Sequence, residues 1–83
     1  MASEVFYKAS VEKDLKKIDK TLCRKLLSHL ETKLGEDPHR GEALSGECHG
    51  LFKYRIGDYR VIYAKIKEGV LVLRVAHRRE VYR

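Results

Sequence analysis

The sequence has few of the residues that crosslink a small protein or hold it in a membrane. Its two cysteines, Cys23 and Cys48, are too few for a disulfide framework, and we expect both to be free thiols in a reducing cytosol. No stretch approaches the roughly 20 apolar residues of a membrane span. Residues Met1–Phe6 lack the basic leader and apolar run of a signal peptide. Together these absences predict a cytoplasmic protein without a membrane segment.

The sequence also lacks a recognisable set of metal ligands. Cys48 and His49 are adjacent, but neighbouring residues chelate a metal poorly, and no C-x-x-C motif accompanies them. Internal repeats, low-complexity tracts and linkers are absent as well. We therefore predict no metal, no other cofactor and a single domain that spans residues 1–83.

Acidic residues are the minority charge. The sequence contains twelve Asp and Glu residues and eighteen Lys and Arg residues, which gives a formal net charge of +6. Such an excess on a body of 83 residues favours a polyanionic partner, which could be RNA, DNA, an anionic membrane or an acidic protein. The charge alone does not choose among these four.

The first half of the sequence indicates two helices after a short strand. Glu4–Lys8 combines adjacent apolar and aromatic residues that suit a first strand. Ser10 is expected to cap a short helix, and the apolar positions of a longer second helix recur with a 3.6-residue period. We expect this second helix to end with Gly35 as its C′ residue, before Pro38. The apolar stripes contain Val11, Leu15 and Ile18 in the first helix, and Leu22, Cys23, Leu26, Leu27, Leu30 and Leu34 in the second.

The second half indicates strands. Residues 35–50 form a polar loop, and three strands are expected at residues 52–56, 59–67 and 70–76. Gly57-Asp58 and Glu68-Gly69 supply the tight turns of a β-meander. The predicted fold class is α+β, with two N-terminal helices packed on one face of a mostly antiparallel four-stranded sheet in the order β-α-α-β-β-β.

Alternation along the strands separates an apolar face from a cationic one. Side chains in a strand point to opposite faces in turn, so Lys53 and Arg55 share the face that no helix covers. The residues expected to face the helices are Phe52, Tyr54 and Ile56 in the first of these strands and Leu71, Leu73 and Val75 in the last. The cations expected on the open face, without matched acids, are Lys53, Arg55, Arg60, Arg74 and, if the last strand continues, Arg78. Tyr82 adds a ring able to stack on a base.

Two segments and one loop carry a family resemblance. The segments are LFKYRIGDYRVIYAK (Leu51–Lys65) and VLRVAHRREVYR (Val72–Arg83), and the loop is Leu44-Ser45-Gly46. In these motifs, and in the order of the elements before them, the chain resembles the RelE-like toxins of the RelE/ParE toxin–antitoxin superfamily. The resemblance covers essentially the whole chain.

The resemblance implies a pair of helices on an antiparallel sheet and a toxin that inhibits translation. The RelE branch enters the ribosomal A site and cleaves mRNA there without a metal. The substrate's own 2′-hydroxyl attacks the phosphate, which leaves a 2′,3′-cyclic phosphate and a free 5′-hydroxyl. The implied partners are mRNA on the ribosome and a cognate acidic antitoxin; the free toxin is expected to be a monomer and the complex a hetero-oligomer.

The family's site positions carry over onto the strands and the closing segment. The implied catalytic residues are Lys53, Arg55, Arg60, Arg78 and Tyr82, together with His77, which lies beside Arg78 as in several relatives. The implied substrate-binding residues are Lys53, Arg55, Arg74 and Tyr82. Arg55 and Arg60 are expected to stabilise the phosphorane, and Arg78 either joins them or protonates the leaving group.

One departure from the family pattern affects the mechanism. The position of Arg55 is a lysine in the best-known branch, and a guanidinium cannot lose a proton in a protein. The general base is therefore sought in His77, Lys53 or Tyr82. His77 suits the task by its ordinary pKa of about 6.5, although the alternation directs it toward the helices.

Two alternatives remain open at this point. ParE-like toxins share the scaffold, inhibit DNA gyrase by binding and generally lack the basic cluster, so Lys53, Arg55, Arg78 and Tyr82 favour the RNA-cutting branch. A catalytically degenerate relative that only binds an antitoxin or nucleic acid is the second alternative. Growth arrest on expression, together with the pattern of mRNA cuts, distinguishes these readings.

Overall fold

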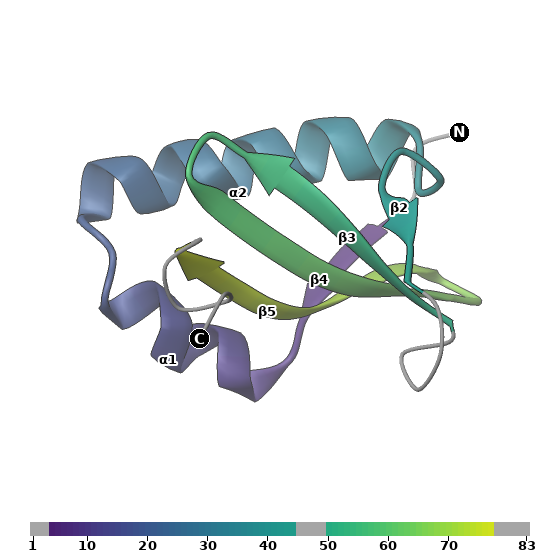
Figure 1. Cartoon of the computed structure of the whole chain (residues 1–83), viewed down its shortest axis with the longest axis horizontal. Coiled ribbons are helices and arrows are strands. Elements are labelled where there is room, and N and C mark those ends of the chain that lie inside the picture. Colours follow the sequence, from purple (N-terminus) through teal and green to yellow (C-terminus); the bar gives the residue numbers. More distant parts are fainter. Residues whose placement is uncertain (1–3, 45–49, 78–83) are drawn as a thin grey trace.

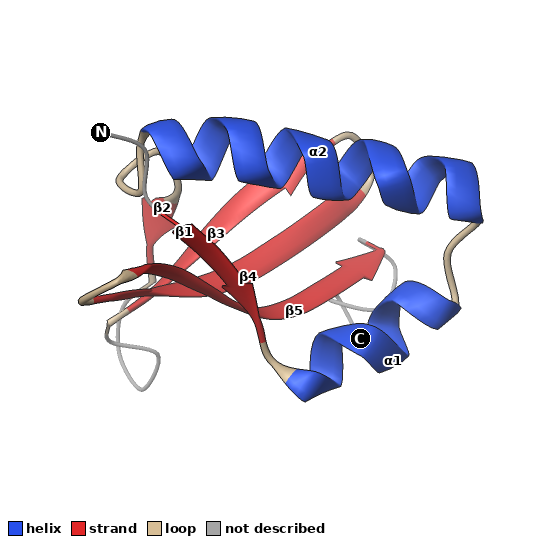
Figure 2. Cartoon of the chain, turned by 180° about the vertical axis from the view of Figure 1, so that it is seen from behind, coloured by secondary structure: helices blue, strands red, loops and turns tan. Residues whose placement is uncertain are grey.

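Two helices cover one face of a five-stranded sheet. The computed structural model describes residues 4–44 and 50–77, and Figures 1 and 2 show it from opposite sides. The elements are β1 (Glu4–Tyr7), α1 (Ala9–Lys16), α2 (Lys20–Glu36), β2 (Glu42–Ala43), β3 (Leu51–Ile56), β4 (Tyr59–Ile66) and β5 (Gly69–His77). The strand order is β1-β5-β4-β3-β2. All neighbours are antiparallel except β1 and β5, which are parallel.

The α+β class and the β-meander are confirmed, whereas the strand count is wrong. The predicted four strands are β1, β3, β4 and β5, and the fifth is β2, which pairs Glu42 with Lys53 and Ala43 with Phe52. Two residues are too few to show an alternating pattern, so the sequence indicated only a loop there. The extra strand matters because it brings the segment after α2 against the open edge of β3.

The core lies between the helices and the sheet. Val11 of α1 and three leucines of α2 are at most 3% exposed and pack in one cluster with the inner face of the sheet. The α2 leucines recur every four residues, which keeps them on one helical face. The buried residues of this cluster are Val11, Leu26, Leu30, Leu34, Val61, Tyr63, Val70, Val72 and Val75. Among the described elements, the helices leave the opposite sheet face uncovered, and Figure 1 shows β3 and β4 in front of α2.

Two helix boundaries differ from their predictions. Lys8, not Ser10, is the N-cap of α1, and Ser10 lies inside the helix with its hydroxyl donating to the Leu73 carbonyl. The second helix continues through Gly35, because the Asp37 N–H still donates to the Lys33 carbonyl at 3.0 Å. Pro38 ends the helix instead, since the residue before a proline is restricted to extended backbone.

Strand β5 contains a bulge that the alternation could not reveal. Its pairing with β4 shifts between Ile62, which faces Arg74, and Tyr63, which faces Val72, so Leu73 is an extra residue. The prediction that Leu71 and Leu73 face the helices is therefore wrong. Both are partly exposed. Beyond the bulge the predicted phase returns, with Val75 buried and Arg74 exposed.

Candidate phosphate-binding site on the open sheet face

Three of the predicted cations come together on the uncovered face of the sheet. Arg55 of β3 and Arg60 of β4 are direct cross-strand partners, and Lys53 lies two residues from Arg55 on the same face. Their strand neighbours Phe52 and Tyr54 pack toward the core, as predicted. The three cations line a hollow of about 440 Å³. Among the described residues, its lining is Arg40, Gly41, Glu42, Lys53, Tyr54, Arg55 and Arg60.

One wall of the hollow is the segment between α2 and β2, and a buried tyrosine holds it. The Tyr63 hydroxyl donates to the Pro38 carbonyl at 2.8 Å and accepts from the Gly41 N–H at 2.9 Å. Burial raises the pKa of Tyr63, which keeps its phenol protonated as a donor. The two bonds fix the segment that carries Arg40 and Glu42.

The expectation of cations without matched acids is wrong for Lys53 and for Arg74. The Lys53 ammonium lies 3.6 Å from a Glu42 carboxylate oxygen, and the Arg74 Nε lies 3.6 Å from Asp14. The Glu42 side chain is 80% exposed, and an exposed pair of this kind contributes at most about 1 kcal/mol. A phosphate can therefore compete for Lys53. Arg55 donates from its Nε to the Gly57 carbonyl at 3.1 Å, which orients its guanidinium.

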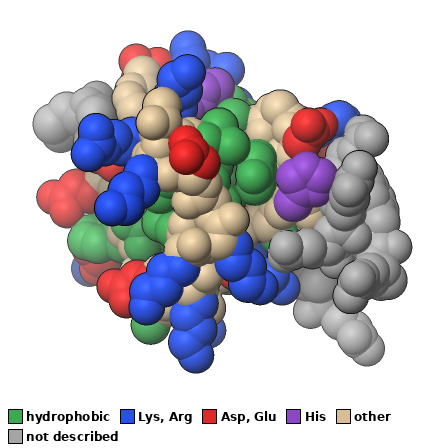
Figure 3. All heavy atoms as spheres, turned by 90° about the vertical axis from the view of Figure 1, so that its left-hand side faces the viewer, with side chains coloured by type: hydrophobic (Ala, Val, Ile, Leu, Met, Phe, Trp, Pro, Cys, Tyr) green, Lys and Arg blue, Asp and Glu red, His purple; other side chains and the backbone are tan. Residues whose placement is uncertain are grey.

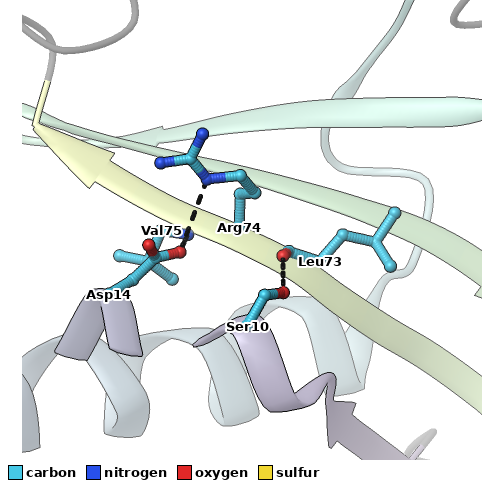
Figure 4. A network of polar contacts seen from close by, with 5 residues as sticks. All are labelled: Ser10, Asp14, Leu73, Arg74 and Val75. Atoms are coloured by element: carbon cyan, nitrogen blue, oxygen red, sulfur yellow. Dashed lines mark hydrogen bonds and ion pairs between the residues drawn. The ribbon is translucent and has the colours of Figure 1, made fainter. Parts of the chain in front are cut away.

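Arg74 is not part of the hollow. It faces Ile62 across the sheet, and Ile62 in turn separates it from Lys53. Its guanidinium forms an ion pair with Asp14 of α1, at the edge of β5 that faces away from β4 (Figure 4). Strand β4 thus separates Arg74 from Lys53 and Arg55, and Arg74 lies diagonally across from Arg60, two residues along the β4–β5 ladder.

His77 faces the helices, as the alternation predicted. It pairs with Tyr59 across the sheet, and the two rings meet edge to face with centroids 5.3 Å apart. It lines a small pocket with Asp14 and Lys17 of the α1 segment. Its side chain therefore lies on the opposite side of the sheet from Arg60, and the structure does not bring it to the hollow.

Several predicted positions lie outside the described residues. These are Arg78, Tyr82, Ser45, Gly46, Cys48 and His49, so the roles expected of Arg78 and Tyr82 stay predictions. In residues 4–44 and 50–77, no three His, Cys, Asp or Glu side chains gather as metal ligands. Over the same residues, neither helix has the length and apolar content to cross a membrane.

Arg40 and Glu42 line the hollow but escaped prediction from the sequence. Their contribution depends on the Tyr63 anchor and on a two-residue strand, neither of which leaves a periodic signal. Glu42 adds the only carboxylate that lines the hollow among the described residues. The site thus offers guanidinium and ammonium donors for a phosphate, and a carboxylate that can accept a proton.

Comparisons with known proteins identify the class of this chain. A family model described as the ParE toxin of the type II toxin–antitoxin system parDE matches residues 5–82. The curated protein "Toxin RelE" of Mycobacterium tuberculosis is 33% identical over 79 residues, which cover 90% of this chain and 80% of that protein. The chain is therefore a toxin of the type II toxin–antitoxin class.

Solved structures narrow the class to a branch. The toxin–antitoxin complex RelBE2 of Mycobacterium tuberculosis contains a chain with a TM-score of 0.86 and 29% identity, covering 93% of this chain and 92% of that one. A double arginine-to-alanine mutant of Escherichia coli toxin RelE, in the free state, has a TM-score of 0.73 and 26% identity, covering 99% and 92%. This chain belongs to the RelE-like toxins of the RelE/ParE superfamily, as its motifs predicted.

Proposed function

We propose that this chain is an endoribonuclease that cleaves mRNA in the ribosomal A site and thereby inhibits translation. The observation that carries the proposal is the hollow in which Lys53, Arg55 and Arg60 line one uncovered sheet face. The similarity of this chain to proteins named RelE, at 33% and 29% identity, supports the proposal as well. The substrate's 2′-hydroxyl attacks the adjacent phosphorus, and the bond to the 5′-oxygen breaks.

We assign to Arg55 and Arg60 the role of binding the phosphate that is cleaved. Directly opposed residues on antiparallel strands have Cβ atoms about 4.5–5.5 Å apart, and like charges at such positions repel. A phosphate between the two guanidinium groups offsets this repulsion and receives bidentate hydrogen bonds. Because negative charge grows on the non-bridging oxygens as the phosphorane forms, these donors bind the transition state more strongly than the substrate.

We assign to Glu42 the role of the general base that accepts the proton of the 2′-hydroxyl. Guanidinium groups do not accept protons, and an ammonium such as Lys53 must first lose one. His77 faces the other side of the sheet, against Tyr59. Among the described residues of the hollow, this leaves the Glu42 carboxylate, with Lys53 at 3.6 Å to orient it. Arg78 keeps its predicted role in stabilising the phosphorane, and Tyr82 keeps its predicted role in base stacking. The leaving 5′-oxygen takes its proton from water, because a guanidinium does not lose one.

The partner that restrains this activity is a cognate acidic antitoxin. The net charge of +6 and the cationic hollow favour an acidic segment that lies across the site. One of the similar structures is described as a toxin–antitoxin complex from Mycobacterium tuberculosis, and another as a RelE–RelB complex from Pyrococcus horikoshii. We assign the same kind of hetero-oligomer to this chain, with a free form that is monomeric and cytoplasmic.

The experiment that tests the proposal maps the cut ends of a defined mRNA. The purified chain is added to ribosomes programmed with that mRNA and to the same mRNA without ribosomes. We expect cleavage on the ribosomes, with 2′,3′-cyclic phosphate and 5′-hydroxyl ends. Intact mRNA, or ends of another chemistry, contradicts the proposal. Because the family model is described as ParE, inhibition of gyrase supercoiling is measured in parallel, and inhibition with intact mRNA supports the ParE-like alternative.

A further inference from the structure

We propose that Arg40 forms a second phosphate-binding position in the hollow, beside that of Arg55 and Arg60, and that the Tyr63 hydroxyl holds Arg40 there. The ligand is single-stranded RNA, so the inference rests on the proposed function and extends its site by one nucleotide step. Arg40 lines the hollow with the other two arginines. It comes from a segment that no strand pattern in the sequence marks.

The register of β2, continued two residues beyond its first residue, brings Arg40 level with Arg55. Glu42 faces Lys53 and Ala43 faces Phe52 in an antiparallel register. Arg40 lies two residues before Glu42, and continuing the same register from Glu42 aligns it with Arg55. Arg55 in turn faces Arg60. Neighbouring strands are about 4.8 Å apart, so a row that continues this register from Arg60 through Arg55 to Arg40 spans roughly 10 Å. A row of this width is wider than one phosphate group and can contact two successive phosphates of one RNA strand.

The backbone on both sides of Arg40 is fixed. Tyr63, which is fully buried, bonds to the Pro38 carbonyl and the Gly41 N–H. The Arg40 N–H donates to the Asp37 carbonyl at 3.1 Å. At Gly41 a Cβ atom would lie 2.6 Å from the Tyr63 hydroxyl oxygen and 2.7 Å from the Lys53 carbonyl oxygen, so the segment packs closely against the sheet. Arg40 is thereby presented by a pre-organised segment, which lowers the entropic cost of binding.

The Arg40 guanidinium is available to a ligand. Arg40 is exposed. Across residues 4–44 and 50–77, its side chain makes no hydrogen bond or ion pair. The carboxylate that shares its wall, Glu42, is paired with Lys53 instead. A guanidinium presented in this way binds a phosphate through two parallel N–H donors.

Two short RNA probes that cannot be cleaved test the second position. Both carry 2′-O-methyl sugars, and they are a dinucleotide with one internucleotide phosphate and a trinucleotide with two. Arg40→Ala is expected to weaken binding of the trinucleotide about tenfold, the effect of one lost charge-assisted contact, and binding of the dinucleotide less than twofold. The matched control is Arg24→Ala, an exposed arginine on α2 outside the hollow, which is expected to change neither.

Two outcomes contradict the inference. Equal binding of both probes by the unaltered protein shows one phosphate position only. An equal loss for Arg40→Ala and Arg24→Ala shows a general effect of charge. Neither result bears on cleavage, which the mapped mRNA ends test separately. If instead the mRNA stays intact while Arg40→Ala weakens the trinucleotide alone, the proposed activity fails and the second phosphate position stands.

A double-mutant cycle tests the positioning role of Tyr63. Tyr63→Phe removes the hydroxyl and keeps the buried ring, and we expect it to weaken the trinucleotide several-fold. In the Arg40→Ala background the same change is expected to have almost no further effect, because Tyr63 acts on RNA only through Arg40. Urea unfolding establishes that each variant is folded. Additive effects in the cycle contradict the positioning role.

Discussion

Glu42 and Lys53 form the ion pair on which the proposed proton transfer depends. Their charged groups are 3.6 Å apart at the rim of the hollow, and both side chains are substantially exposed. Because Glu42 pairs with Lys53 in the β2–β3 ladder, the strand backbone and not the ion pair alone determines where the carboxylate lies. A substitution that keeps the shape of this side chain therefore isolates its ability to accept a proton.

Glu42→Gln is expected to slow mRNA cleavage by about 10²–10⁴, the contribution of a general base, without weakening RNA binding. The amide keeps the size of the side chain but accepts no proton, and the change removes a negative charge from a phosphate-binding site. Single-turnover cleavage on programmed ribosomes and anisotropy with a 2′-O-methyl RNA measure the two effects. Glu68→Gln, in the exposed turn between β4 and β5, is the control. A Glu42→Gln rate within threefold of the unaltered protein contradicts the assignment.

At the scale of elements, α1 completes the edge of β5 that β1 leaves open. The four residues of β1 pair with Gly69–Val72, so within residues 4–44 and 50–77 the remainder of β5 has no strand neighbour on that side. Two side chains of α1 supply the missing partners (Figure 4). The Ser10 hydroxyl donates to the Leu73 carbonyl at 2.9 Å, and the Asp14 carboxylate accepts from the Val75 N–H at 2.9 Å.

Asp14→Ala is expected to lower the free energy of unfolding by about 1–3 kcal/mol, because it leaves a largely buried N–H without an acceptor. Asp14→Asn is expected to restore at least half of this loss, since its amide oxygen still accepts from Val75. Glu12→Ala removes the same charge from the exposed side of α1 and is expected to cost about 0.3–1 kcal/mol. Urea unfolding measures all three. An Asp14→Asn variant as unstable as Asp14→Ala shows that the carboxylate acts through its charge on Arg74 instead.

The elements also show which structural features a sequence pattern can predict. The leucine period of α2 and the alternation of β3 predicted the buried faces correctly, because each is a repeat over several residues. The bulge at Leu73 and the strand β2 were not predicted. A bulge changes the phase of one strand relative to its neighbour, and a two-residue strand has no phase to detect, so both depend on pairing between distant segments.

At the scale of the whole molecule, positive charge extends well beyond the hollow. Figure 3 views the left-hand side of Figure 1 and shows Lys and Arg side chains over much of that surface, together with several acidic ones. The net charge of +6 therefore favours polyanions in general. Cross-strand placement distinguishes Arg55 and Arg60 from the other cations, since the two face each other on an uncovered sheet.

The candidate site was accordingly predictable only in part. The spacing of Lys53, Arg55 and Arg60 in two strands sufficed to place them on one face, and the structure confirms this. Arg74 lies on the predicted face of the sheet but outside the hollow, because Ile62 lies between them and an ion pair with Asp14 draws the guanidinium away. Arg40 and Glu42 could not be found, because their approach to β3 is determined by the buried Tyr63 hydroxyl.

The most direct test of the central claim compares two double variants with the same change in net charge. Arg55→Ala/Arg60→Ala removes the opposed pair, and Arg24→Ala/Lys67→Ala removes two exposed cations outside the hollow. Single-turnover cleavage of mRNA on programmed ribosomes is measured for both, after urea unfolding has shown that both fold. The first variant is expected to lose at least about 10²–10³ in rate, and the second to stay within threefold of the unaltered protein. Equal losses, or a first variant that cuts at the unaltered rate, contradict the account.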